Sequence, residues 1–369
     1  MSLVERLGLE HPIVGAGLGG GLSRARLTAA IAEAGGLGQI GILPPALMRQ
    51  ELAAHRERGT GPVAANLLLP FARRAHWELA GEADALVTFW GRPRRRTDGV
   101  WVHQCGSVDE ARAAAEAGAD GVIAQGVEAG GHVRGTTPAL ELLERTSAAL
   151  PAGYPLWLAG GVAERADVEA ALAAGAEAVV VGTRFLLSEE SDAHPDYKRR
   201  LLDARETVLT ELFGAGWPAP HRVVRNAATE RWLGDDERGP AWVRALHRGT
   251  APALSRMPVG LTQRAARSQR PGMPMLGPAA ATVDGPDSLL DAGPLYAGEC
   301  VARIGGLRPA GDLVRVLGGV NQDRDPANPT PEELRETAAS EGLMATDEET
   351  DPEFEDDRDP ADVPDAEMG

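Results

Sequence analysis

Three copies of one short pattern constrain the fold of this chain more than any other feature of its sequence. Each copy is an alanine-rich stretch, a glycine and then an apolar run, and the copies occupy 29–41, 110–124 and 167–182. Alanine favours helices, glycine ends them, and β-branched runs suit strands that are buried on both faces. A helix followed by a buried strand, repeated, is typical of parallel βα units. The pattern therefore predicts an α/β protein.

Eight apolar runs are predicted to be the strands of the sheet. Eight parallel strands with helices between them favour a closed (β/α)8 TIM barrel over an open sheet. The strands are expected at 12–17, 37–42, 62–68, 85–91, 100–106, 121–126, 155–161 and 178–186. The connection 92–99 is too short and too broken for a crossover helix, so either that helix is missing or the strand count is wrong by one.

The chain of 369 residues is longer than such a barrel needs. We expect a barrel domain over 1–325, with an insertion after strand 8, at 188–275, that forms helices packed over one end. The proline-rich stretch 271–286 is expected to cross back, and 307–318 to be the closing helix.

The negative charge of the chain is concentrated near its C-terminus. The formal net charge is −17, but 331–369 alone holds 16 acidic and 2 basic residues, which leaves 38 acidic and 35 basic residues in 1–330. A nearly neutral folded part does not indicate a nucleic-acid-binding surface. Close-spaced carboxylates among prolines cannot bury enough apolar surface to fold, so 326–369 is predicted to be a disordered acidic tail. A docking segment for a basic partner is the alternative for this tail.

Two cysteines, Cys105 and Cys300, have no metal-ligand spacing around them, which favours a reducing compartment over a disulfide scaffold and indicates no metal site. The N-terminus lacks the apolar core of a signal peptide, and no apolar run reaches the roughly 18 residues needed to span a bilayer. We therefore expect a cytoplasmic protein without a membrane partner. The sequence leaves its oligomeric state open.

The stretch from Gln125 to His132 (Gln-Gly-Val-Glu-Ala-Gly-Gly-His) is a candidate catalytic loop. It follows the apolar run 121–124, so it lies where a buried strand ends. Gly130 and Gly131 let the backbone approach a ligand closely because they carry no Cβ. The imidazole beside them has an unperturbed pKa close to neutrality, which suits proton transfer. A histidine that only binds loop backbone is the alternative.

The ends of the last two predicted strands are candidates for holding a phosphate. In barrels of this kind the active site lies at the C-terminal ends of the strands, and phosphate often binds after strands 7 and 8. Those ends are Gly160-Gly161 and Val181-Gly182-Thr183, and a helix that opens near Glu164 would add the positive end of its dipole. Each glycine turn alone could equally be a plain tight turn.

Polar side chains inside apolar strands either have a structural role or bind a ligand. Asn66 lies in the apolar strand 62–68, and a buried amide without a hydrogen bond costs roughly 1–3 kcal/mol. Asn66 and Gln125 therefore either bond neighbouring backbone or point into a polar ligand. For His103, on another strand, a satisfied core histidine is favoured over a ligand.

Taken together, these motifs resemble the nitronate monooxygenase family, formerly called 2-nitropropane dioxygenases. The resemblance spans about 15–320 and rests on the Gln125–His132 loop, Ala159-Gly160-Gly161, Gly182-Thr183-Arg184-Phe185-Leu186 and later stretches that include His194-Pro195 and Leu295-Tyr296. It implies a TIM barrel with non-covalent FMN. It also implies oxidation of alkyl nitronates by O2 to a carbonyl compound and nitrite.

The resemblance also implies roles for single residues. His132 is similar to the family's catalytic histidine, which would orient a nitronate or remove the α-proton of a nitroalkane. The residues expected to contact FMN are Gly17, Asn66, Gln125, Gly130, Gly131, Gly160, Gly161, Val181, Gly182 and Thr183.

The chain departs from the family pattern after strand 1, where Ala16-Gly17-Leu18-Gly19 replaces an Ala-Pro-Met turn, and at Val180, where the family often has glutamine. Two other functions stay open. One is a flavin-dependent enoyl-ACP reductase, which shares the Glu-Ala-Gly-Gly-His loop and would need NAD(P)H and a basic docking surface such as the arginines of 92–96. The other is an FMN-binding protein without turnover.

Overall fold

The computed structural model describes residues 1–319 apart from 60, 255–256 and 258. Its eight predicted strands lie side by side in one parallel sheet, in the order β1-β9-β8-β6-β5-β4-β3-β2. A bridge between Val14 and Leu37 joins the two ends of this sheet, so it closes as a (β/α)8 barrel. In chain order the strands are β1 (Ile13–Gly15), β2 (Gly38–Ile40), β3 (Val63–Leu68), β4 (Ala85–Phe89), β5 (Val100–Cys105), β6 (Gly121–Gln125), β8 (Leu156–Ala159) and β9 (Ala178–Val181).

Helices connect successive strands at all but one step. They are α2 (Ala25–Glu33), α3 (Pro45–Arg58), α4 (Arg74–Ala80), α5 (Val108–Glu116), α6 (Ala139–Ala149) and α7 (Arg165–Ala173). The last helix, α14 (Ala310–Gly318), packs between α7 and α2 and completes the ring, as the sequence predicted for 307–318. No helix lies between β4 and β5. The strand count was therefore right, and the short connection 92–99 lacks its helix.

The predicted last strand, 178–186, was too long. β9 stops at Val181, and Thr183–Leu186 is the short helix α8. A short apolar run has no periodicity that separates a strand from a buried helical turn, so Phe185 and Leu186 were read as strand. All four residues of α8 are buried.

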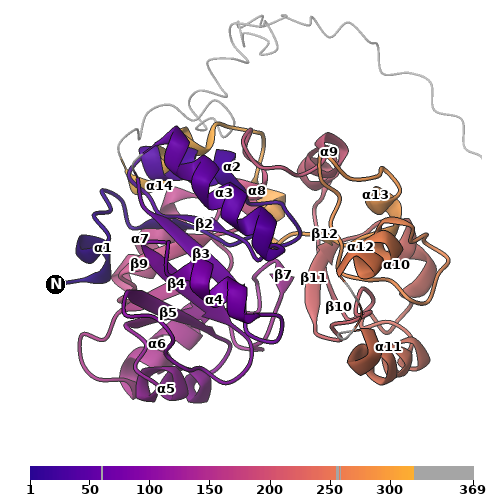
Figure 1. The fold of residues 1–369 in the computed structure, drawn as a ribbon, viewed down its shortest axis with the longest axis horizontal. Helices are drawn as coiled ribbons and strands as arrows, with labels where there is room; N and C mark the ends of the chain where they lie inside the picture. Colours follow the sequence, from indigo (N-terminus) through magenta and orange to yellow (C-terminus); the bar gives the residue numbers. More distant parts are fainter. Residues whose placement is uncertain (60, 255–256, 258, 320–369) are drawn as a thin grey trace, which may run out of the picture. The chain divides into compact units, whose positions relative to one another are not determined.

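The segment between β9 and α14, which includes the predicted insertion 188–275, contains the expected helices and also strands. It contains α9 (Pro195–Asp203), α10 (Ala227–Trp232), α11 (Ala241–Leu254), α12 (Val259–Arg267) and α13 (Leu289–Ala292), followed by a 3-10 helix at Glu299–Arg303. It also contributes an antiparallel sheet of β10 (Val208–Thr210), β11 (His221–Val224) and β12 (Leu295–Tyr296). The barrel loop after β6 adds β7 (Gly131–His132) to β11 (Figure 1).

Alternation along the barrel strands separates two apolar layers. One set of side chains packs outward against the helices, and the other set fills the barrel interior. Leu3, Leu7 and Leu9, within and just after the N-terminal helix α1 (Leu3–Arg6), join the interior cluster. Interior side chains nearest the C-terminal strand ends instead line a cavity.

None of the helices in the described ranges combines the length and the apolar character that a bilayer crossing requires. The predicted acidic tail, 326–369, lies outside the described residues.

Candidate functional site

A cavity of about 700 Å³ opens at the C-terminal ends of the barrel strands. The barrel supplies one side of its wall. The later chain supplies the other side, with residues 215–217, 254, 257, 265–266, 269, 275, 277–279, 296–298 and 300. Ten of the residues that the sequence singled out line it. They are Gly17, Asn66, Gln125, Gly130, Gly131, His132, Gly160, Gly161, Gly182 and Thr183.

Val181, the remaining predicted contact, is not part of the wall. Its side chain is fully buried in the layer between strands and helices, and its carbonyl accepts a hydrogen bond from Ala16 N–H (2.9 Å). Its neighbour Val180 points into the barrel and lines the cavity. Alternation along β9 explains the difference.

Gln125 braces the candidate catalytic loop. Its Nε2 donates to the carbonyl of His132 (3.0 Å), and its Oε1 accepts from the N–H of Arg134 (3.2 Å). Of the two roles open to this amide, backbone bonding is therefore the one that the structure contains. The amide fixes the chain direction on both sides of Val133, directly after His132.

Three further contacts hold the same loop. The guanidinium of Arg222 donates to the carbonyl of Val127 (2.8 Å), and the carboxylate of Glu128 accepts from the N–H of Ala139 at the start of α6 (3.0 Å). Gly130 lies against the backbone of Gly298, where an added Cβ would come within 2.5 Å of the Gly298 nitrogen. A side chain at position 130 would push the loop out of place.

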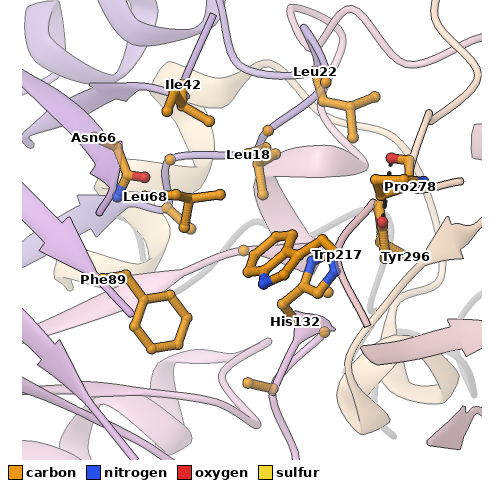
Figure 2. Close-up of a pocket in the computed structure, with 18 of the residues that line it drawn as sticks. Leu18, Leu22, Ile42, Asn66, Leu68, Phe89, His132, Trp217, Pro278 and Tyr296 are labelled. Carbon is orange, nitrogen blue, oxygen red and sulfur yellow. Dashed lines mark hydrogen bonds between the residues drawn. The ribbon is translucent and has the colours of Figure 1, made fainter. Parts of the chain in front are cut away.

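His132 stacks against Trp217, with ring centroids 3.6 Å apart and an interplanar angle of 20° (Figure 2). Its Nε2 is buried without a hydrogen-bond partner among the residues described. Burial and the neighbouring His221 hold the pKa of His132 well below its usual value. The imidazole is therefore neutral near pH 7.

His221 contacts His132 from β11, at 5.3 Å between ring centroids. One ring nitrogen accepts from Phe213 N–H (3.2 Å) and the other contacts the carbonyl of Ala219 (2.9 Å), which fits a neutral tautomer with the proton on Nδ1. Burial lowers the pKa of His221 to about 4. Neither imidazole brings a positive charge to the cavity at neutral pH.

Trp217 was not anticipated from the sequence. It lies in the insertion, in Gly-Ala-Gly-Trp-Pro, and its ring makes edge contacts with Phe71 and Trp90 at 5.2 and 5.3 Å. No local pattern relates this position to the barrel, because the contacts are between distant segments. Only the fold brings the tryptophan over His132.

Asn66 and Gly17 fit together at the wall. Asn66 Nδ2 donates to Oε1 of Gln39 (3.2 Å), and a Cβ at Gly17 would lie 2.4 Å from the Asn66 Cβ. The glycine after β1 is therefore required by the side chain on β3. The Nε2 of Gln39 is buried without a partner in the described ranges, so this amide pair is incompletely satisfied by the protein.

Gln104 is a second wall residue that the sequence reasoning missed. It is the last but one residue of β5 and lines the cavity, and its side chain has no hydrogen bond to any described residue. The signal was present, because Gln104 is an amide near the end of an apolar strand, as Asn66 is. By contrast, His103 faces the outer layer and bonds Thr88 (2.7 Å), which confirms that it is a satisfied core histidine.

The two glycine turns offer backbone donors. No acceptor for the N–H groups of Gly160, Gly161 and Gly182 is found in the described part of the chain. The start of α7 is different from the prediction, since the carboxylate of Asp167 already accepts from the N–H groups of Ala163 (2.8 Å) and Glu164. Any anion here would use the turns rather than that helix end.

Thr183 has a structural contact of its own. Its hydroxyl accepts a hydrogen bond from the N–H of Gly298 (2.8 Å). The turn after β9 is thereby tied to the segment that follows β12, next to Gly130. The strand ends and the returning chain form one connected wall.

The chain is similar to one protein family, to individual relatives and to solved structures. The family model described as nitronate monooxygenase matches residues 2–100 and 93–318. A dehydrogenase of Mycobacterium tuberculosis named for an octahydro-indene-4-carboxyl-CoA substrate is 34% identical over 250 residues, 62% of this chain and 67% of that protein. The nitronate monooxygenase of Pseudomonas aeruginosa is 31% identical, over 60% of this chain and 80% of that protein. The structure of FabK from Thermotoga maritima has a TM-score of 0.67 at 27% identity, covering 93% of this chain and 98% of that one.

Proposed function

The chain belongs to the nitronate monooxygenase family, and on that premise we propose that it is an FMN-dependent enzyme that oxidises alkyl nitronates or nitroalkanes. Its relatives are oxidoreductases, and the chain is an oxidoreductase enzyme. The proposed co-substrate is O2, and the proposed products are a carbonyl compound and nitrite. The observation that carries the proposal is one cavity lined both by a buried histidine whose Nε2 has no hydrogen-bond partner and by glycine turns whose N–H groups have no acceptor, among the residues described.

The wall fits a flavin mononucleotide chemically. The N–H groups of Gly160, Gly161 and Gly182 suit the oxygens of a phosphate. The amides of Asn66 and Gln104 suit the polar edge of the flavin ring, and the apolar side chains between them suit its flat face. When bound, the flavin supplies the redox chemistry that no side chain here can supply.

His132 has the chemistry of a general base in this scheme. A neutral imidazole can take the α-proton of a nitroalkane, and it carries no charge that would attract a nitronate over long range. Gln125 holds the backbone directly after His132, and Trp217 keeps water from one face of the imidazole ring. Arg73 is the single permanently charged side chain of the wall in the described ranges. The wall therefore offers an anionic substrate one positive charge and no cluster of them.

The test of this proposal starts from the absorption spectrum of the purified protein. A bound-flavin spectrum is expected, then loss of flavin colour on anaerobic mixing with a nitronate and its return in air with release of nitrite. A colourless protein that takes up no FMN would contradict the cofactor assignment. A flavin that is inert to every nitronate would contradict the reaction.

A second candidate is an enoyl-ACP reductase-like activity, which the match to FabK over nearly the whole chain favours. NAD(P)H-dependent bleaching of the flavin would support it. The basic docking surface suggested by the arginines of 92–96 is partly engaged, because Arg95 pairs with Asp120 (3.2 Å) and Arg96 stacks on Trp77. A flavin inert to both nitronates and NAD(P)H would instead support an FMN-binding protein without turnover.

A further inference from the structure

The outer part of the cavity differs from the strand ends. It is lined by side chains from α11, α12 and the segments between and after them, which the barrel itself does not supply. We call these residues the insertion wall; they are Leu254, Met257, Ala265, Ala266, Met275 and Ala279. All six side chains are apolar, whereas the strand ends offer amides and free N–H groups.

The insertion wall has almost no polar group to offer a ligand. Its neighbour Gln269 is buried, and both ends of its amide are used by one residue. Oε1 accepts from Gly277 N–H (2.9 Å) and Nε2 donates to the Gly277 carbonyl (3.4 Å). The carbonyl of Pro278 accepts from the hydroxyl of Tyr296 (3.3 Å) (Figure 2). A charged or strongly polar ligand group would lose its water here without gaining partners.

The insertion wall and His132 line the same cavity, so one molecule can contact both. The free N–H groups and the amides lie at the strand ends, which assigns the phosphate and polar edge of a cofactor to that side. The apolar side is left for the substrate. Burial of apolar surface is the attraction that the described side chains of the insertion wall offer.

We propose that the substrate carries an extended apolar group, an alkyl chain or a saturated ring system, that lies against the insertion wall while its reactive carbon faces His132. This inference rests on the proposed function only for the reacting group at His132. Each methylene that enters the insertion wall should strengthen binding about fourfold, the equivalent of about 0.8 kcal/mol.

Chain-length series test the proposal with and without turnover. Straight-chain carboxylates, from propanoate to nonanoate, have the shape and charge of nitronates but do not react, and calorimetry on the FMN-loaded protein gives their Kd. The matching nitronates, from nitroethane to 1-nitrooctane, give kcat/KM from nitrite release. Both series are expected to improve about fourfold per methylene until the wall is covered.

Ala266→Trp fills the insertion wall, and Ala253→Trp is the matched control because Ala253 is exposed and lies outside the cavity lining. Ala266→Trp should abolish the gain with chain length, and Ala253→Trp should leave that gain at its parent value. If Ala266→Trp fails to fold, Met257→Ala, which removes a contact, should flatten the same series.

The outcomes separate the two proposals. A carboxylate series that does not depend on length overturns the inference, whether or not nitrite is released. A length-dependent carboxylate series without nitrite from any nitronate supports the inference and overturns the proposed reaction.

Discussion

The two sides of the cavity are built by different means. On the barrel side, the Gln125–His132 loop is held by an amide, a guanidinium and a carboxylate that each bind its backbone or that of α6. On the insertion side, Trp217 is held by ring contacts, and its indole N–H has no hydrogen bond to any residue in the described ranges. Directional bonds fix one side, and non-directional packing shapes the other.

This difference separates two tasks. Reaction and cofactor geometry need atoms held within fractions of an ångström, and hydrogen bonds to backbone supply that precision. Apolar walls tolerate changes of similar volume, so they can be altered without disturbing the strand ends. The barrel side is therefore expected to govern turnover, and the insertion side to govern which substrates enter.

The largest effect is expected on the barrel side of the cavity. His132→Ala should keep FMN and lower the turnover of neutral nitroalkanes by about 10²–10⁴-fold, because it removes the base that takes the α-proton. Nitrite release and flavin absorbance measure the two properties separately. Preformed nitronates have already lost that proton and serve as the control, with a smaller expected loss. Oxidation of neutral nitroalkanes at the parent rate would remove His132 from the mechanism.

Acid should weaken both sides in the same pH window. Burial lowers the pKa of His103, in the barrel, and of His221, in the insertion sheet, to about 4 from 6.5. Their contribution to stability is therefore complete above pH 6.5 and is lost as the pH falls toward 4. By pH 4, the lowered pKa of each histidine should have reduced the free energy of unfolding by roughly 3 kcal/mol relative to pH 7.

Denaturant unfolding of the wild type, His103→Gln and His221→Gln at pH 7 and pH 4.5 checks this expectation. Each variant should show a smaller drop between the two pH values than the wild type. A drop of equal size in all three proteins would show that other groups govern acid unfolding.

Gly17 and Gly19, in the turn after β1, test how closely the barrel side of the cavity is packed. Gly17→Ala places a Cβ 2.4 Å from the Asn66 Cβ, so Asn66 must move, whereas a Cβ at Gly19 has no atom within 4 Å. Gly17→Ala should weaken FMN binding about tenfold or more, the equivalent of about 1–3 kcal/mol of overpacking. Gly19 also lines the cavity but has no protein neighbour to displace, so Gly19→Ala should keep the parent's stability, and fluorescence titration measures the FMN affinity of Gly17→Ala against that of the parent. Equal affinities would contradict the assigned contact between Gly17 and Asn66.

Trp217 should have the smallest and most specific effect. Trp217→Ala admits water to His132, so the pKa of the imidazole should rise toward its ordinary value and the acid limb of the pH profile of kcat/KM should move to higher pH. The titratable neighbours, His221 on β11 and Tyr296 on β12, stay in place. Trp217→Phe should restore the parent profile, and Trp242→Ala, at an exposed site, should leave it unchanged. A profile that does not move would limit Trp217 to packing.

Much of the barrel side of the cavity was predictable because its sequence signals are local. Strand ends, glycine turns and a histidine next to them stand within a few residues of one another, and alternation along each strand decides which side chains face inward. The same rule explains why Val181 was misplaced by one position. It also shows that Gln104 could have been found from its place near the end of an apolar strand.

The insertion side was not predictable in this way. β10, β11 and β12 are two to four residues long, and β11 pairs with β12 and with β7, which are far from it in the sequence. Trp217 stacks on His132 across that same distance, and nothing in its immediate sequence indicates a barrel contact. Non-local packing decides both features, and a single sequence shows only local patterns.

The closure of the barrel at β1 has a consequence for its synthesis. β1 forms a three-residue ladder with β9, but it meets the β2 side only through the bridge from Val14 to Leu37. The first strand to leave the ribosome must therefore wait for the last one. At roughly 5–20 residues per second, the nascent chain spends on the order of ten seconds as an open sheet with unpaired edges. Edges of this kind are where chains pair wrongly with one another, so binding of chaperones during translation should be strongest before β9 emerges.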